Sequence, residues 1–211
     1  MTSTTSTNAL NKHFAEVIFS TNEMLTAQCY KEALTDSPLK TTVFQGSIVK
    51  IISSYDTSYN AFGLISKINN SSLDNVHKPS ALGLTAKELE HLQPQVFDLL
   101  RKELEIHLFA YKEKEEIYNY PPSKPMMIHD FVSKVENAEV LELTKDISSL
   151  ITLVKRNQLK PDLLSNIISL GYTLRNNDYN YLVKTGQGLS IAFADELDSL
   201  IQVLKRLSKA K

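Results

Sequence analysis

His129 and Asp130 are neighbours in this sequence and have the side chains that acid–base chemistry needs. An imidazole beside a carboxylate can take up and return a proton near neutral pH. The pair follows Pro125 within a segment that reads as a β-strand. We therefore interpret His129 as a pleat-facing residue whose ring hydrogen-bonds locally, with a catalytic role as the alternative.

Metal-binding and nucleophilic chemistry have weak support in the sequence. No two of the five histidines have the i, i+4 spacing of a helical metal site; they are His13, His77, His91, His107 and His129. Cys29 is the single cysteine, so no intrachain disulfide can form. It lies in a β-patterned run with no base nearby, which predicts a buried, inert thiol. We expect no cofactor, no metal and no enzymatic activity.

Two glycine-containing segments could contact phosphate or a partner. Thr185-Gly186-Gln187-Gly188 lacks a lysine and follows no strand, so we interpret it as a helix break. The connection 69–84 is longer than most structureless loops, which are often binding segments. Its candidate binding residues are His77, Lys78, Pro79 and Gly83. The alternative is that Pro79, Ala81 and Leu82 hold the loop over an open barrel end.

Strand-like segments dominate the first two thirds of the chain. They are residues 14–21, 24–30, 46–53, 59–68, 103–111 and 126–132, with a short return strand at 117–120 after a charged turn. We expect Phe62, Leu64 and Ile68 to share one face, and Gly63 to mark a bend. A second expected face contains Leu104, Ile106, Leu108 and Ala110. These segments predict a small six-stranded antiparallel β-barrel.

Helical patterns interrupt and follow these strands. Thr85 and Glu88 have capping-box spacing, and Pro94 divides the short helices 86–91 and 95–100. From about residue 137 the apolar period becomes helical, with a break near Asp146 and a new helix starting at Pro161. The last region, 178–208, is expected to break at its glycines and to bury one stripe. That stripe contains Leu189, Ala192, Phe193, Leu197, Leu200, Ile201 and Leu204.

The resulting plan is an α+β protein with a tail at 1–12, a barrel domain at 13–134 and a helical region at 135–211. The 211 residues carry a net charge of −1, which argues against a surface dominated by phosphate contacts. A local basic patch remains compatible with that charge. No apolar run has membrane-spanning length, and the opening residues lack a signal-peptide pattern. We expect a disordered tail and a cytoplasmic protein with no membrane contact.

The first half of the chain resembles a HAS barrel, the domain named for HerA-type DNA translocases and rotary ATP synthases. The residues that carry the resemblance are EVIFSTNEMLTAQCY, GSIVKI followed by YNAFGLISKI, HKPSALG and PPSKPMMIHDFV. The whole chain is similar to an uncharacterised group of bacterial, largely cyanobacterial, proteins. The resemblance implies docking at the edge of a ring-shaped ATPase. The sequence itself has no Gly-x-x-x-x-Gly-Lys-Ser/Thr loop.

Three hypotheses of function follow. The first is a non-catalytic interaction or assembly module that binds a protein partner, such as a HerA-type or other ring ATPase, and that can form homo-oligomers. The second is a nucleic-acid-binding small barrel, with aromatic side chains supplied by Tyr55, Tyr59, Phe109 and Tyr111. The third is an enzyme whose site is assembled from distant residues.

Overall fold

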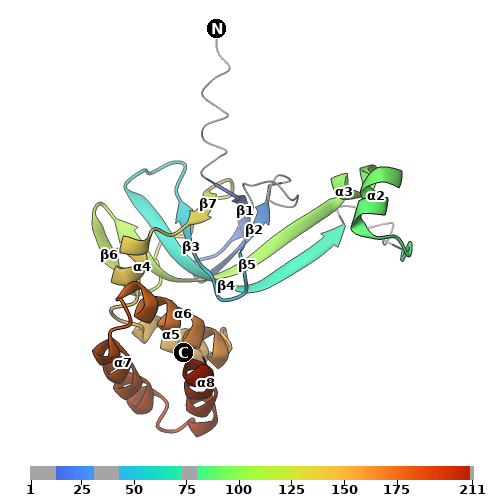
Figure 1. Ribbon diagram of the computed structural model, residues 1–211. Helices are drawn as coiled ribbons and strands as arrows, with labels where there is room; N and C mark the ends of the chain where they lie inside the picture. The colour runs from blue at the N-terminus through green and yellow to red at the C-terminus, as the bar shows by residue number, and fades with distance from the viewer. Residues whose placement is uncertain (1–12, 31–42, 73–79, 210–211) are drawn as a thin grey trace.

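The computed structural model describes residues 13–30, 43–72 and 80–209. Within them, seven antiparallel strands form one sheet in the order β2-β1-β7-β3-β4-β5-β6, and a further pairing joins β2 to β5. The strands are β1 (Ala15–Ser20), β2 (Met24–Cys29), β3 (Ile48–Ile52), β4 (Tyr59–Ser72), β5 (Leu100–Glu113), β6 (Glu116–Tyr118) and β7 (Phe131–Lys134). The β2–β5 pairing closes the predicted six-stranded antiparallel barrel, with β6 attached outside the ring (Figure 1).

Alternating side chains fill the barrel and cover part of its outer surface. In β3, Val49 and Ile51 point into the barrel core, whereas Ile48 points to the outer face. Bulges change this alternation in β4 and β5, because an extra residue moves the following side chains to the other face. A bulge between Ile65 and Lys67 places Ile68 against the interior, so it does not share a face with Phe62.

The same effect divides the predicted face of β5. Leu104, Ile106 and Leu108 line the interior, but Ala110 belongs to the outer cluster. The register passes from Phe62↔Ala110 to Gly63↔Leu108, which leaves Phe109 as the extra residue. Alternation alone does not reveal where such an insertion falls.

The last barrel strand lies later than the expected 126–132. β7 covers Phe131–Lys134, and the residues before it form a turn. The buried carboxylate of Asp130 holds this turn by accepting a hydrogen bond from the backbone N–H of Met127 at 2.7 Å. His129 has a positive φ of 73°, which an extended strand does not allow. The prediction of strand at Met126–Asp130 was therefore wrong.

Strands β4 and β5 extend beyond the barrel as a two-stranded arm. Their pairing continues from Asn69↔Glu103 to Ser72↔Leu100, so the predicted loop begins at least four residues later than expected. At the end of the arm lie α2 (Ala86–Leu92), with the predicted Thr85–Glu88 capping box, and the short α3 (Gln95–Asp98) (Figure 1).

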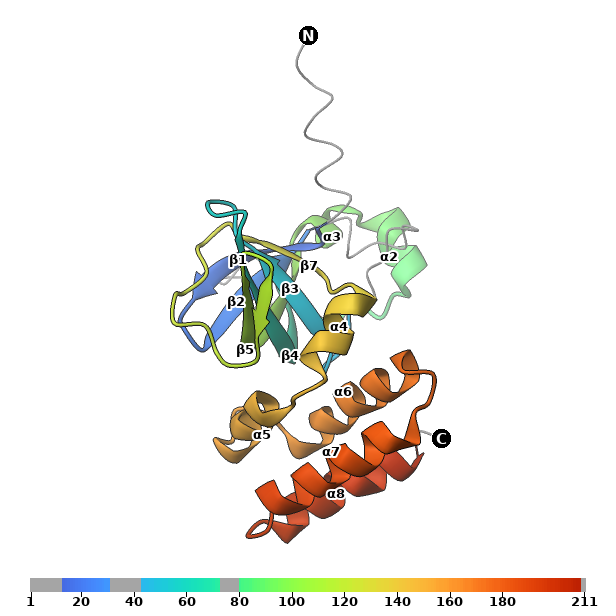
Figure 2. The same cartoon turned by 90° about the vertical axis from the view of Figure 1, so that its left-hand side faces the viewer.

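Five helices follow the barrel and pack beneath it (Figure 2). They are α4 (Asn137–Leu143), α5 (Ser148–Lys155), α6 (Pro161–Leu174), α7 (Tyr179–Ala192) and α8 (Leu197–Lys209). The buried side chains of these helices form one core with Ile48, Phe62 and Phe109 from the barrel's outer face. The predicted helix starts near Asn137 and at Pro161 and the break near Asp146 are confirmed. No helix in the described ranges combines the length and apolarity that crossing a bilayer requires.

The glycines of α7 do not break the helix. α7 continues through Gly186 and Gly188 and ends at Ala192, followed by the C-cap residue Phe193, whose side chain is fully buried. A glycine costs a helix only about 1 kcal/mol relative to alanine, and packing of the flanking residues Tyr181, Leu189 and Phe193 offsets that cost. The chain turns at residues 194–196, so the predicted break at Gly186 was wrong.

A candidate docking groove between two helices

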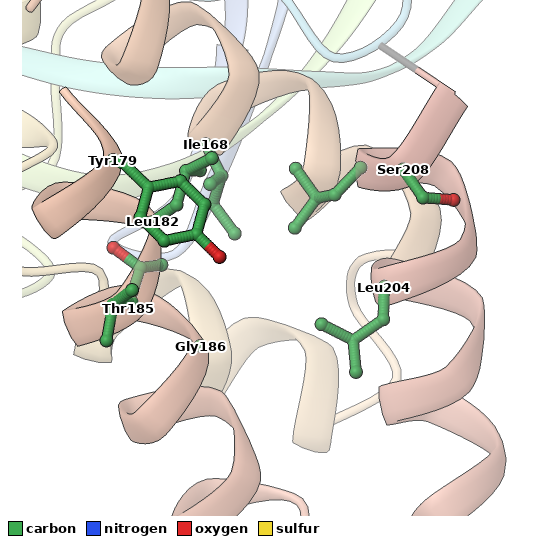
Figure 3. A pocket seen from close by; sticks show the side chains of 9 residues that line it. Ile168, Tyr179, Leu182, Thr185, Gly186, Leu204 and Ser208 are labelled. Carbon is green, nitrogen blue, oxygen red and sulfur yellow. The ribbon is translucent and has the colours of Figure 1, made fainter. Parts of the chain in front are cut away.

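A concave surface in the helical region lies between α7 and α8. Both helices pack on α6, and Ile168 of α6 lies at the base of a groove of about 200 Å³ between them. Figure 3 shows Leu182 and Thr185 of α7 on one side and Leu204 of α8 on the other. The remaining lining residues are Tyr179, Val183, Gly186, Leu207 and Ser208. The lining is mostly apolar, as in grooves that bind small molecules or amphipathic helices.

The α8 wall carries an apolar stripe that the protein's own core does not use. Val203 faces α6 and is fully buried, with Leu200 and Leu207 packed against the same core. The exposed stripe contains Leu197, Ile201 and Leu204, whose side chains are 62%, 37% and 42% exposed. The prediction that these three residues are buried was therefore wrong, whereas Leu189 and Phe193 are buried as expected.

The reason lies in where α7 ends. A break at Gly186 would have allowed one continuous helix to bury residues from Leu189 to Leu204 on one side. Instead, the turn at 194–196 separates α7 from α8, so the two helices bury different faces. In α8, the face that contains Val203 is the one that packs on α6. The sequence shows the spacing of Leu197, Ile201 and Leu204, but spacing alone does not distinguish a core-facing stripe from an exposed one.

The α7 wall is open because of Gly186. A Cβ atom added at this glycine would meet no atom within 4 Å, so it would project into free space. Tyr179 and Val183, which lie on the same side of the helix, are 65% and 41% exposed. This wall therefore offers both bare backbone and apolar side chains to a bound segment.

Arg175 anchors the helices that position the groove. Its guanidinium donates hydrogen bonds to Thr144 Oγ1 at 2.8 Å, to Gly171 O at 2.9 Å and to Leu141 O at 2.7 Å. The same group lies 4.3 Å from the ring centroid of Tyr181, a cation–π contact with α7. Arg175 thus connects the end of α4, the end of α6 and the start of α7.

On the other side, α8 is tied to the start of α6. Arg206 Nη1 donates to Asp162 Oδ2 at 2.6 Å. Both partners are about half exposed, so this ion pair orients α8 more than it stabilises the fold. The groove is consequently bounded by two helices that are each fixed to α6.

Of the predicted binding residues, only Gly83 lies among the described residues; His77, Lys78 and Pro79 fall outside them. Gly83 is exposed, has a φ of 68° and has no atom near its missing Cβ. It belongs to the end of the β4–β5 arm, where several leucines are exposed: Leu82, Leu84, Leu92, Leu99 and Leu100. This apolar arm tip lies apart from the groove (Figure 1).

The expected His129–Asp130 pair does not work as one site. The exposed His129 ring contacts Glu16, whereas Asp130 is fully buried and accepts hydrogen bonds from Ser54 and Met127. Asp130 therefore holds two loops together at one end of the barrel. The ring of His129 thus contacts a residue distant in the sequence, and His129 lies in a turn and not in a strand.

Of the aromatic residues expected to bind nucleic acid, Tyr59 and Tyr111 are in contact, with ring centroids 5.7 Å apart, whereas Phe109 and Tyr55 do not join them. Phe109 is buried against the helical layer and Tyr59 is only 6% exposed, whereas Tyr55 is 75% exposed in a loop. Tyr111 stacks on Tyr118 with ring centroids 5.0 Å apart. Carboxylates accompany this aromatic group, since Glu116 accepts from Tyr118 and Glu113 pairs with Lys124. Nucleic-acid binding stays a prediction.

Burial shifts the pKa values of two titratable side chains in the barrel. Burial raises the pKa of the Cys29 thiol to about 11, against a smaller lowering by Lys102. Burial lowers the pKa of His107, whereas the nearby carboxylates of Glu105 and Glu23 act in the opposite direction. In the described part of the chain, no three His, Cys, Asp or Glu side chains gather closely enough to hold a metal ion.

The fold and the groove define an α+β protein built from a closed small barrel and a helical layer. No protein-family model matches the sequence, and no curated protein matches it either.

Proposed function

We propose that this protein is a non-catalytic assembly module that binds an amphipathic helix of a protein partner in the groove between α7 and α8. The observation that carries the proposal is the exposed stripe of Leu197, Ile201 and Leu204 beside that groove. Contiguous exposed apolar surface commonly marks an interaction site in a folded protein.

The shape of the groove favours a helix as the occupant. Its two walls are helices and its base is a third helix, so a fourth helix would complete a bundle. Amphipathic helices bind such grooves through apolar residues at i, i+3, i+4 and i+7. The barrel supports this surface, since its outer residues Ile48, Phe62 and Phe109 share a core with the helices.

The resemblance to HAS barrels suggests the wider setting. A barrel that docks on a ring-shaped ATPase would use the helical layer to hold a further subunit. The exposed leucines at the arm tip are a second apolar surface in the same molecule. An assembly role accounts for two such surfaces better than a role confined to one small ligand.

Site-specific crosslinking in the native cell tests this proposal. A photoreactive phenylalanine derivative replaces Val183, which lines the groove and is 41% exposed. We expect a discrete protein adduct from this position. The matched control places the same group at Tyr55, which is 75% exposed on the barrel, where we expect no such adduct.

A second variant connects the adduct to the groove. Leu204→Lys places a charge on the groove wall at a half-exposed position, so the fold should tolerate it. We expect the Val183 adduct to disappear in this background. Absence of any protein adduct at Val183 would overturn the proposed function.

A further inference from the structure

The exposed stripe of α8 has the period of a helix–helix seam. Leu197, Ile201, Leu204 and Ser208 follow one another at steps of four, three and four residues. This is the spacing of the a and d positions in a heptad, which line the contact between paired helices. The seam lies beside the protein's own core, because Val203 is the fully buried residue of α8.

One edge of this seam carries two opposite charges. Asp198 and Lys205 are seven residues apart, so they lie on the same side of α8, two turns or about 10 Å from each other. Both are exposed, and neither forms an ion pair with another described residue. The other edge of the seam contains Leu200 and Leu207, which pack into the core.

This charge pattern is self-complementary in one orientation. If two copies of α8 paired in parallel and in register, each Asp198 would be level with the other Asp198. If they paired antiparallel about Ile201, Asp198 of each copy would lie within one residue, or about 1.5 Å of helix rise, of the level of Lys205 in the other. Charges beside a helix seam set partner choice and orientation.

The antiparallel arrangement also fills the groove. The groove is lined by Val183 and Leu204, so it lies at the carboxyl-terminal half of α8. A twofold axis at Ile201 brings Leu197 of a second copy level with this half. Ile191 of the second copy, which is 79% exposed, lies near the same end of the hairpin and would approach this half as well. Two strongly exposed apolar side chains thus meet the hollow part of the other copy.

We infer that the occupant of the groove is the α7–α8 hairpin of a second copy of this chain, paired antiparallel about Ile201. The inference rests on the proposed function, because it names the partner of the same groove. Such a twofold interface is isologous, with the same residues contributed by both copies. We expect a reversible dimer with a dissociation constant in about the micromolar range.

Sedimentation velocity of the full chain, from low to high micromolar concentration, tests the inference. We expect a monomer–dimer equilibrium that Ile201→Asp shifts to monomer, because two carboxylates would meet at the axis. Leu197→Asp changes a more exposed residue and should act in the same direction, with circular dichroism confirming that both variants are folded. A wild-type chain that is monomeric throughout would overturn the inference.

Charge exchange tests the antiparallel register. Asp198→Lys and Lys205→Asp each create two repulsive pairs and should each weaken the dimer about three- to tenfold. The double variant restores opposite charges and should recover most of the wild-type affinity. Lys145→Asp, an equal charge change at an exposed position in the turn after α4, should leave the dimer unchanged. Failure of the double variant to recover would overturn the antiparallel arrangement.

The crosslinking experiment separates this inference from the proposed function. If both hold, the Val183 adduct has the mass of two copies of the chain. An adduct with a different protein, together with a monomeric chain in solution, overturns only the inference. Absence of any adduct overturns the proposed function itself.

Discussion

Lys50 and Glu139 form an ion pair that joins the barrel to the helical layer, with Lys50 Nζ 2.5 Å from Glu139 Oε1. The side chains are only 18% and 11% exposed, so water screens the pair weakly. Glu139 also accepts a hydrogen bond from the backbone N–H of Glu136 and closes the capping box of α4. A single carboxylate therefore holds both the start of α4 and its contact with β3.

Removing the charge of Glu139 should loosen this junction. We expect Glu139→Gln to lower the free energy of unfolding by about 2 kcal/mol, the scale of a shielded hydrogen bond to a charged group. Urea denaturation followed by circular dichroism measures the change. Lys50→Met and the double variant complete a double-mutant cycle. A coupling free energy near zero would show that the pair does not stabilise the junction.

Gly63 should resist even a small side chain. A Cβ atom at this position would lie 2.3 Å from Ile106 Cγ2 and 3.1 Å from the carbonyl oxygen of His107, within the β4–β5 pairing. We expect Gly63→Ala to destabilise the protein by about 1–3 kcal/mol through overpacking. The control is Gly186→Ala, where a Cβ meets nothing within 4 Å and the helix should gain up to about 1 kcal/mol. Equal effects of the two substitutions in urea denaturation would contradict this account.

Asp130 should prove structural and not catalytic. Its carboxylate accepts hydrogen bonds from Ser54 N and Ser54 Oγ, both at 2.8 Å, and from Met127 N. We expect Asp130→Asn to lower the melting temperature and to cost about 1–3 kcal/mol, because it replaces one acceptor oxygen with a donor among buried donors. Asp146→Asn alters a similar contact, to Ser148 N and Oγ, at an exposed helix start. The Asp146 variant should lose clearly less stability, and the opposite order would refute the assignment.

Cys29 should make the stability of the protein depend on pH in alkaline solution. Its folded pKa of about 11 lies above the ordinary value of 9.0, mainly because of burial. Between these values the unfolded chain releases the thiol proton and the folded chain keeps it. This stabilising contribution is therefore complete below pH 9 and is lost as the pH rises through 11.

The corresponding loss is about 2–3 kcal/mol across that interval. Comparing wild-type with Cys29→Ala by urea denaturation, at neutral pH and midway between pH 9 and 11, isolates the contribution of the thiol. We expect the stability of the wild-type chain to fall more than that of the variant as the pH rises. A parallel decline of the two proteins would contradict the expected role of Cys29.

Local patterns in the sequence predicted much of the architecture. Alternation in 46–53 correctly indicated a strand, and it is the alternation that puts Val49 and Ile51 on one face and Ile48 on the other. Capping and proline signals correctly placed the starts of α2 and α6. These features depend only on neighbouring residues and their backbone preferences, so they can be predicted from the sequence alone.

The tertiary structure decided the features that depend on distant partners. The bulges that divide β4 and β5 between two cores result from pairing with other strands, and the β7 turn results from contact between Asp130 and Ser54. The groove results from the burial of Phe193, which moves the end of α7 past both glycines.

The sequence by itself therefore determined a small antiparallel barrel followed by amphipathic helices, because side-chain period and helix capping are local properties. Which face of α8 enters the core was not a local property. Its apolar residues cover more than one side of the helix, and only packing against α6 chose Val203 and left Leu197, Ile201 and Leu204 exposed for another molecule.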